Sequence, residues 1–287
     1  MAEIIQKDGT WAFDGDALRL TPGRDKNVSL LRRALGELVV PLGALAGISF
    51  EQGKKAGRLR LRLRDGADPL LHASGGRLTE PNDPYQLLVE SDRYGVAEYF
   101  TDEVRNALLL DEVPSDPVDE YLLPGPSLPL SVSAGDGTAS FDGEQIRLEW
   151  NWKTEDAKAA AGTRTLAVTD VVAVEWQPAA GLENGYLRFT VRGAATKAPP
   201  KYDPHSVELW GFKKDPLMAL VAAAVQARLP HPSAAPVDAP PKQLEEPPRD
   251  DHDALLRRLR ELGELHRTGV LTDEEFTMAK QAVLKRL

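Results

Sequence analysis

The chain has 287 residues, a formal charge of −9 at pH 7 and no cysteine. This composition excludes a disulfide framework, a thiol nucleophile and thiolate metal sites, and the negative charge disfavours nonspecific binding to nucleic acid or to an anionic membrane surface. Because there is no run of about 20 apolar residues and no basic start followed by an apolar stretch, we expect a cytoplasmic protein without a membrane span or signal peptide.

An internal repeat predicts the domain organisation. Residues 9–20 (GTWAFDGDALRL) and 137–148 (GTASFDGEQIRL) are identical at seven of twelve positions, at an offset of 128. Three further landmarks of the first copy recur in the same order in the second, namely residues 48–50, 57–63 and 83–84. Landmarks in a common order indicate a duplicated domain. We place the two copies at residues 1–112 and 130–230.

The strands of each copy are predicted from two-residue alternation. The Phe-Asp-Gly triplet places a glycine where a hairpin turn needs positive φ, with alternating residues on both sides. Apolar, β-branched and aromatic residues at strand spacing follow over 38–50 and 166–176, and Arg and Leu alternate over 58–64. Each copy is therefore expected to be rich in antiparallel strands.

One helix is predicted at the end of each copy. Apolar residues recur every three to four positions over 95–110 and over 216–229. Pro216 suits a helix N-terminus, and Asp215 is expected to cap it. The predicted fold class is α+β, with two tandem antiparallel β-rich domains that are each closed by one C-terminal helix. This order resembles that of pleckstrin-homology-like domains.

Two segments rich in proline and acidic residues, 113–129 and 231–249, are predicted to be linkers. Seven prolines lie from Pro230 to Pro248, which indicates that the second segment is an extended spacer. A role as a proline-motif ligand is the alternative.

Residues 250–287 change to helical spacing and predict a C-terminal α-helical hairpin. Thr272 and Glu275 form a capping box at the start of its second helix. A segment this short buries too little surface to fold alone, so its apolar stripe should dock on a second copy or on another protein. Packing on its own chain is the alternative. The stripe consists of Leu255, Leu259, Leu262, Phe276 and Val283.

The tail and the repeats resemble known families. The run from Gly269 to Phe276 (GVLTDEEF) and the closing Leu-Lys-Arg-Leu resemble the SHOCT domain, a short C-terminal bacterial module. The two repeats with their Phe-Asp-Gly start resemble the domain of unknown function 4429, which typically occurs twice ahead of such a tail. The resemblance implies this architecture, with oligomerisation or protein docking by the tail. It supplies no catalytic residues.

A basic hairpin in the first copy is a candidate anion-binding surface. Alternation along the strand places the arginines on one face and leucines on the other, and arginine offers bidentate hydrogen bonds to phosphate groups. The alternative is a solvated strand face that prevents edge pairing. The candidate residues are Lys54, Lys55, Arg58, Arg60, Arg62 and Arg64.

The loop before the last strand of each copy is a second candidate surface. It carries Asp83 and Tyr85 in the first copy, and Asp203 and His205 in the second. An Asp-Pro pair suits an Asx-turn, while the rings either bind a peptide or pack at the rim of the sheet.

Catalytic and metal-binding motifs are absent from the sequence. None of the five histidines has metal-ligand spacing, and there is no phosphate-binding loop or nucleophile elbow. We therefore expect no enzyme activity, no cofactor and no metal. The sequence predicts an adaptor or scaffold that binds an unknown protein partner and oligomerises or docks through its tail. The alternative is a peripheral binder of anionic lipid or nucleic acid through the basic hairpin.

Overall fold

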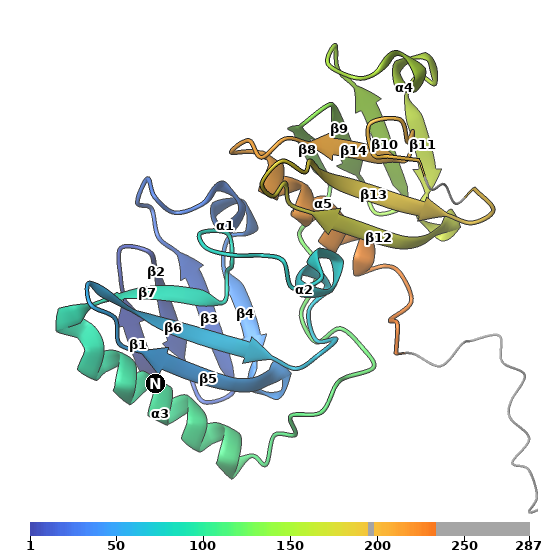
Figure 1. Cartoon of the computed structure of the whole chain (residues 1–287). Helices are drawn as coiled ribbons and strands as arrows, with labels where there is room; N and C mark the ends of the chain where they lie inside the picture. Colours follow the sequence, from blue (N-terminus) through green and yellow to red (C-terminus); the bar gives the residue numbers. More distant parts are fainter. Residues whose placement is uncertain (195–197, 234–287) are drawn as a thin grey trace, which may run out of the picture. The chain divides into compact units, whose positions relative to one another are not determined.

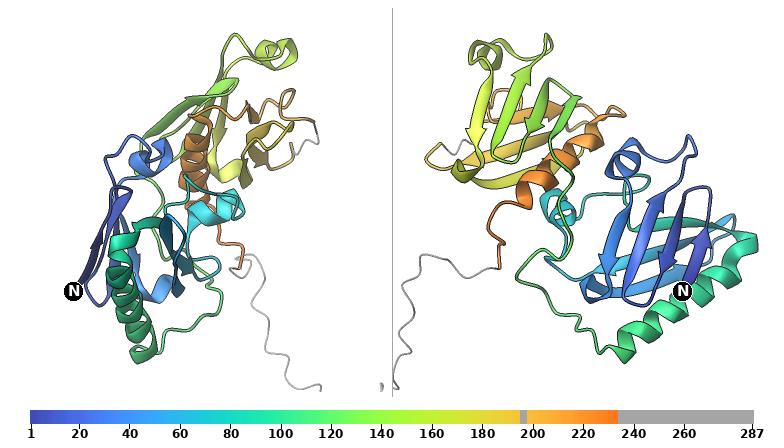
Figure 2. Two further views of the ribbon diagram at one scale, coloured as in Figure 1. Left: turned by 60° about the vertical axis from the view of Figure 1, so that its left-hand side comes forward. Right: turned by 180° about the vertical axis from the view of Figure 1, so that it is seen from behind.

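The computed structural model describes residues 1–194 and 198–233, which form two β-rich halves (Figure 1). The first half contains a four-stranded antiparallel sheet in the order β1-β2-β3-β4 and a three-stranded sheet in the order β5-β6-β7 (Figure 2). Three helices accompany them: α1 (Leu30–Leu35), α2 (Pro69–Ser74) and α3 (Tyr94–Leu110). The strands are β1 (Ala2–Ile5), β2 (Gly9–Phe13), β3 (Ala17–Pro22), β4 (Leu38–Pro41), β5 (Leu45–Glu51), β6 (Ala56–Leu63) and β7 (Gln86–Glu90).

The second half repeats this arrangement with the sheets β8-β9-β10-β11 and β12-β13-β14. Its helices are α4 (Asp156–Ala160) and α5 (Met218–Gln226). The same strand order, closed by one helix in each half, confirms the predicted duplication. The strands are β8 (Leu130–Ala134), β9 (Gly137–Phe141), β10 (Gln145–Trp150), β11 (Arg164–Ala167), β12 (Val171–Gln177), β13 (Gly185–Val191) and β14 (Ser206–Leu209).

The Phe-Asp-Gly hairpin turns have the predicted geometry. The Asp14 Oδ1 atom accepts the backbone N–H groups of Asp16 and Ala17 at 3.1 and 2.9 Å, and Gly15 has φ +117°. Asp142 makes the corresponding bonds in the second copy, where Gly143 also has φ +117°. These N–H donors lower the pKa of both carboxyl groups.

The predicted strand regions 38–50 and 166–176 are each divided between two sheets. A 3-10 turn over Leu42–Ala44 separates β4 from β5, and one over Val168–Asp170 separates β11 from β12. Because such a turn preserves the apolar composition on both sides, the sequence pattern alone does not show where the chain changes sheet. The short helices α1, α2 and α4 were not predicted.

The expected cap at Asp215 was wrong. Residues Asp215–Leu217 form a 3-10 turn without a side-chain cap, and α5 begins only at Met218. The Asp215 Oδ2 atom instead accepts the backbone N–H groups of Trp210, Gly211 and Phe212 at 2.8, 2.8 and 3.0 Å. The carboxylate closes the preceding loop because three backbone N–H groups of that loop converge on it. A helix cap would use fewer N–H donors.

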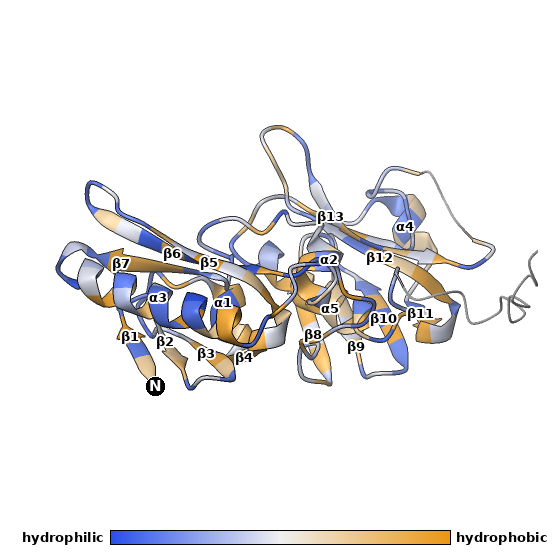
Figure 3. Cartoon of the chain, turned by 90° about the horizontal axis from the view of Figure 1, so that it is seen from below, coloured by the Kyte–Doolittle hydropathy of each residue, from blue (hydrophilic) through white to orange (hydrophobic). Residues whose placement is uncertain are grey.

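The closing helices differ in how they are buried. Helix α3 packs on β5 and β1 and buries only four of its residues, so it keeps a polar face (Figure 3). Every residue of α5 is buried. Helix α2 of the first copy packs against α5 and covers it. Leu70 and Ala73 of α2 belong to the hydrophobic core of the second copy. The two copies therefore share a core.

Polar contacts reinforce this junction. Arg77 of the first copy pairs with Glu175 of β12 at 3.2 Å. The amide of Gln226 in α5 donates to the Tyr121 hydroxyl at 2.8 Å, and the same hydroxyl lies 2.6 Å from His72 Nδ1 in α2. His231 Nε2 donates to the Gly66 carbonyl at 3.1 Å.

The segment between the copies, expected as a linker over 113–129, follows the surface of the first copy. The backbone N–H groups of Leu122 and Leu123 both donate to the Ala67 carbonyl, at 2.9 and 3.0 Å, and Leu123 is buried in the first core. This segment therefore contributes to the folded body.

The predicted linker 231–249 lies outside the described residues from position 234 onward, and so does the whole predicted hairpin 250–287 with its apolar stripe. Among the helices that the structure describes, none combines the length and the apolar character needed to cross a bilayer.

Candidate functional site

Strand β6 arranges the basic hairpin as the alternation predicted, because Leu59, Leu61 and Leu63 are buried on the opposite face. Four of its cations, Lys54, Lys55, Arg58 and Arg62, are exposed, while Arg60 and Arg64 are half-buried.

Three of the four arginines have hydrogen-bond partners within the chain. Arg62 donates from Nη2 to the Ala46 carbonyl at 3.2 Å. Arg58 pairs with Glu80 at 2.8 Å. Arg64 donates from Nε to the Asp116 carbonyl at 2.8 Å and from Nη1 to the Gly43 carbonyl at 3.0 Å. These bonds hold loops of the first copy on β6, so Arg58 and Arg64 have structural partners.

Arg60 and Arg62 line a groove together with the loop before β7. Arg60, Arg62, Asp83 and Tyr85 all border this groove, whose volume is about 610 Å³. The structure thus brings together two candidate surfaces that the sequence analysis treated separately. The remaining lining residues are Gly47, Ile48, Ser49, Leu61, Leu63, Asp65 and Leu71.

The acidic wall of this groove is held by hydrogen bonds. The Asp83 Oδ1 atom accepts the Tyr85 N–H at 2.9 Å, in the Asx-turn geometry expected, and Gln86 Nε2 donates to Oδ2. Burial raises the pKa of Asp83, while these bonds and the nearby Arg32 and Arg60 oppose the rise.

Tyr85 is a buried residue rather than an exposed ring. Its hydroxyl donates to Asp68 Oδ2 at 2.8 Å, and burial raises its pKa well above the usual value. Only part of its surface borders the groove, so Tyr85 supports the groove from below.

Arg60 is the least satisfied group in the groove. Its Nε atom is buried and has no hydrogen-bond partner within the described part of the chain. A buried guanidinium N–H without a partner is costly. Arg60 also forms no ion pair within the described residues, so an anionic ligand group in the groove would meet a guanidinium without a counter-charge.

The second copy closes the equivalent position with its own atoms. Arg188, which aligns with Arg60 at the offset of 128, lies 3.1 Å from Asp203 Oδ2 through Nε and donates from Nη2 to the Ala198 carbonyl at 2.7 Å. Asp203 is fully buried and accepts the His205 N–H at 2.9 Å. His205 is half-buried, and burial lowers its pKa. Arg188 and Asp203 thus pair with each other at this position, whereas Arg60 borders an open groove in the first copy.

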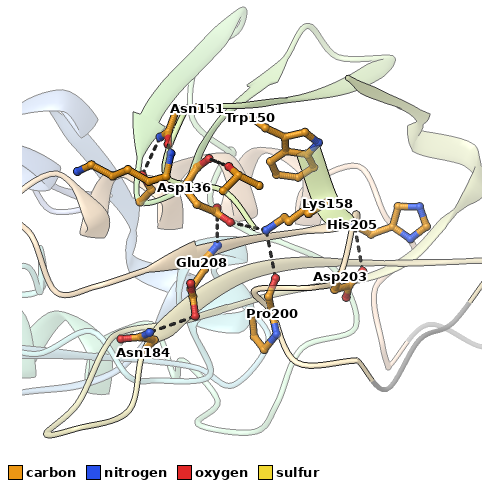
Figure 4. A network of polar contacts seen from close by, with 12 residues as sticks. Asp136, Trp150, Asn151, Lys158, Asn184, Pro200, Asp203, His205 and Glu208 are labelled. Carbon is orange, nitrogen blue, oxygen red and sulfur yellow. Dashed lines mark hydrogen bonds and ion pairs between the residues drawn. The ribbon is translucent and has the colours of Figure 1, made fainter. Parts of the chain in front are cut away.

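A buried ion pair was missed by the sequence analysis (Figure 4). Lys158 Nζ lies 2.6 Å from Asp136 Oδ2, donates to the Pro200 carbonyl at 3.1 Å and sits 4.5 Å from the centroid of the Trp150 ring. The Lys158 side chain has 0% exposure. Burial lowers the pKa of Lys158 and raises that of Asp136, and their mutual attraction opposes both shifts.

The first copy contains a counterpart of this pair. Arg32 of α1 donates to Asp8 Oδ1 at 2.8 Å, and Asp8 Oδ2 accepts the Leu88 N–H of β7. In the second copy Asp136 Oδ1 accepts the Glu208 N–H of β14 in the same way. Each pair thus ties a short helix to the last strand of its copy.

The signal for this pair was in the sequence. Asp8 and Asp136 immediately precede the repeated twelve residues and are identical at the same offset. Because both pairs lie within their domains, the second enclosed and the first largely buried, we assign them a structural role.

Residues 1–194 and 198–233 contain no candidate metal site, because no group of three or more His, Asp or Glu side chains in them is placed to hold a metal ion. Three of the five histidines, His72, His205 and His231, are described. The rings of His72 and His231 make the contacts given above, whereas His205 Nδ1 is buried without a hydrogen-bond partner in the described part of the chain.

Comparison with known proteins finds a match to one family model. The family model described as "Domain of unknown function (DUF4429)" matches residues 11–105 and again residues 139–226. These two segments cover more than half of the chain and fall on the two copies. No curated protein matches the sequence.

Proposed function

We propose that this chain, which belongs to the DUF4429 family and carries its domain twice, is a non-enzymatic adaptor that binds a protein partner through the groove of its first copy. The observation that carries the proposal is the difference between Arg60 and Arg188. Arg188 forms an ion pair with Asp203 and donates from Nη2 to the Ala198 carbonyl, although its Nε, like that of Arg60, makes no hydrogen bond within the described residues. Arg60 forms no ion pair in the described part of the chain and borders an open groove.

The partner should present a carboxylate next to an apolar side chain. Arg60 and Arg62 offer charge-assisted hydrogen bonds to an acidic group. Leu61, Leu63 and Leu71 supply the apolar part of the lining. A pocket with few polar groups in an apolar surround suits a peptide segment better than a multiply charged polymer.

We further propose that each copy has a pleckstrin-homology-like fold. Support comes from the division of each copy into sheets of four and three antiparallel strands followed by one helix.

The tail completes the proposed adaptor. Its resemblance to the bacterial SHOCT module and its apolar stripe support oligomerisation or docking by residues 250–287. At about 25 cal/mol per Å² of buried apolar surface, its five stripe residues can contribute several kcal/mol, less the costs of ordering and association.

The binding of anionic lipid or nucleic acid through the basic hairpin is less well supported. Arg58 and Arg64 have internal partners, and Asp65 and Asp83 also line the groove. A strongly acidic polymer would meet these carboxylates.

Affinity capture from cytoplasmic extract tests the proposal with four proteins: the intact chain, residues 1–249, an Arg60→Gln/Arg62→Gln variant and an Arg19→Gln control, in which an exposed arginine of β3 is changed. We expect the groove variant to lose a protein that the control retains, with affinity lower by at least about tenfold.

The tail is tested in parallel by light scattering over a wide concentration range. The intact chain should associate or retain a partner that residues 1–249 lose. If the intact chain and the groove variant capture the same proteins equally well, the groove is not the binding site.

A further inference from the structure

Two loops of the second copy bring three aromatic rings around one lysine. Lys153 Nζ lies 5.4, 5.2 and 5.7 Å from the ring centroids of Trp152, Trp210 and Phe212. The Trp210 and Phe212 rings meet edge to face at 6.0 Å. The Trp152 residue is 89% exposed and Phe212 is 58% exposed. This arrangement leaves a large aromatic area in water.

The loop that carries Trp210 and Phe212 has a defined conformation. The buried Asp215 carboxylate accepts three consecutive backbone N–H groups from it, and Gly211 adopts φ +83° within it. The exposure of Phe212 is therefore fixed by the fold.

The other loop is held in a similar way. Asn151 Oδ1 accepts the Lys153 N–H at 2.9 Å, and Asn151 Nδ2 donates to the Gly135 carbonyl at 2.9 Å. Both loops present their rings in water on a preorganised backbone, which favours binding because little ordering remains to be done.

The fold itself does not require these rings. At the corresponding offsets of 128 and 120, the first copy carries Arg24 in place of Trp152, Glu90 in place of Trp210 and Asp92 in place of Phe212. In the first copy Glu90 ends β7 and forms an ion pair with Lys7, and Asp92 lies in a 3-10 turn. The aromatic residues are thus particular to the second copy.

Three lysines accompany the rings on the two loops, and the exposed carboxylates of Glu155 and Asp156 follow Lys153 in the chain. Lys153, Lys213 and Lys214 are exposed, and none of them forms an ion pair within the described residues. Glu208, the acidic residue next to Trp210, already accepts the Trp210 indole N–H at 3.2 Å and the Asn184 amide at 3.1 Å. The surface therefore offers three exposed ammonium groups that form no ion pair within the described residues.

We propose that Trp152, Lys153, Trp210, Phe212, Lys213 and Lys214, here called the aromatic–lysine surface, insert into the interface of an anionic membrane. Indole and phenyl rings enter the headgroup region, where the indole N–H stays hydrated, and the lysines meet anionic headgroups. The charge of −9 for the whole chain does not prevent this, because the lysines act within a Debye length of about 8–10 Å.

The test is flotation of the full chain with vesicles of phosphatidylcholine alone or of phosphatidylcholine with phosphatidylserine. We expect binding to the anionic vesicles, weakened by added salt, with a blue shift of tryptophan fluorescence. A Trp152→Ala/Phe212→Ala variant should bind at least about tenfold more weakly. A Lys153→Gln/Lys213→Gln/Lys214→Gln variant should lose the preference for anionic vesicles.

The matched control is Tyr99→Ala on α3, which removes another exposed ring, at 57% exposure, from the first copy and should leave binding unchanged. The lysine variant keeps the proposal falsifiable if the aromatic variant does not fold. The proposal is overturned if the intact chain floats with neither vesicle, or if both variants bind as the intact chain does. Self-association abolished by the aromatic variant, without vesicle binding, would also overturn it and identify a second copy as the occupant.

Discussion

Helices α3 and α5 close the two copies in the same topological position, but their environments differ. Helix α3 keeps an exposed face that includes Tyr99 and Leu109, whereas every residue of α5 is buried. The difference arises from the connection between β6 and β7, which carries α2 and covers α5. A duplicated domain has thus become one body because an insertion in one copy supplies the cover for the other.

The binding surfaces of the two copies diverge in the same manner. The first copy leaves Arg60 open to a groove where the second closes Arg188 on Asp203. The second copy exposes rings where the first carries Glu90 and Asp92. We infer that duplication preserved the scaffold while each copy acquired its own contact surface.

The largest expected effect is a loss of stability when the cation of an ion pair is removed, and this loss should differ between the two copies. Lys158→Met leaves the enclosed Asp136 without its cation and should lower the free energy of unfolding by about 3–5 kcal/mol. Arg32→Met should cost less, because the Asp8 side chain is 20% exposed and can be hydrated. Urea unfolding of both variants measures the difference. Equal losses would show that the two pairs are equally enclosed.

The next effect is the loss of stability when the packing of α2 on α5 is weakened. Leu70→Ala removes a buried side chain of α2 from the shared core and should cost about 2–4 kcal/mol. Leu109→Ala, on the exposed face of α3, should change stability by no more than about 0.5 kcal/mol. Calorimetry should show one transition over both copies in the intact protein. Two independent transitions in the intact protein would argue against a shared core.

A smaller loss of stability should appear as the pH falls below neutral. Burial lowers the pKa of His72 and of His205, and the nearby His231 adds to the effect on His72. The unfolded chain then binds more protons, so the stabilising contribution of the neutral rings is present above the unfolded pKa of 6.5 and is lost as the pH falls through the folded pKa values.

The melting temperature should therefore fall between about pH 7 and about pH 5. This fall should be reduced in His72→Gln and in His205→Gln. An unchanged pH profile in both variants would assign the acid sensitivity to other groups.

The sequence allowed the repeat, the Phe-Asp-Gly turns and the closing helices to be predicted, because these depend on local spacing. The sequence also contains two patterns that indicate the burial of α5 and the ion pairs of Asp8 and Asp136. The run MALVAAAVQ of α5 is apolar on all sides, which indicates a helix buried all round, and Asp8 and Asp136 are identical at the offset of the repeat.

The remaining features depend on tertiary contacts. The partners of Arg58 and Arg188 come from distant loops, and the carboxylate of Asp215 turns back toward Trp210 rather than capping a helix. The aromatic–lysine surface is assembled from two loops almost 60 residues apart, so net charge and local composition gave no indication of it.

The most direct test of this division between the copies is to measure both activities in both surface variants. Arg60→Gln/Arg62→Gln should lose the captured protein partner and still float with anionic vesicles. Trp152→Ala/Phe212→Ala should show the reverse, because the two surfaces share no residue. If either variant loses both activities while its melting temperature is unchanged, the two copies do not act through separate surfaces, and this account is contradicted.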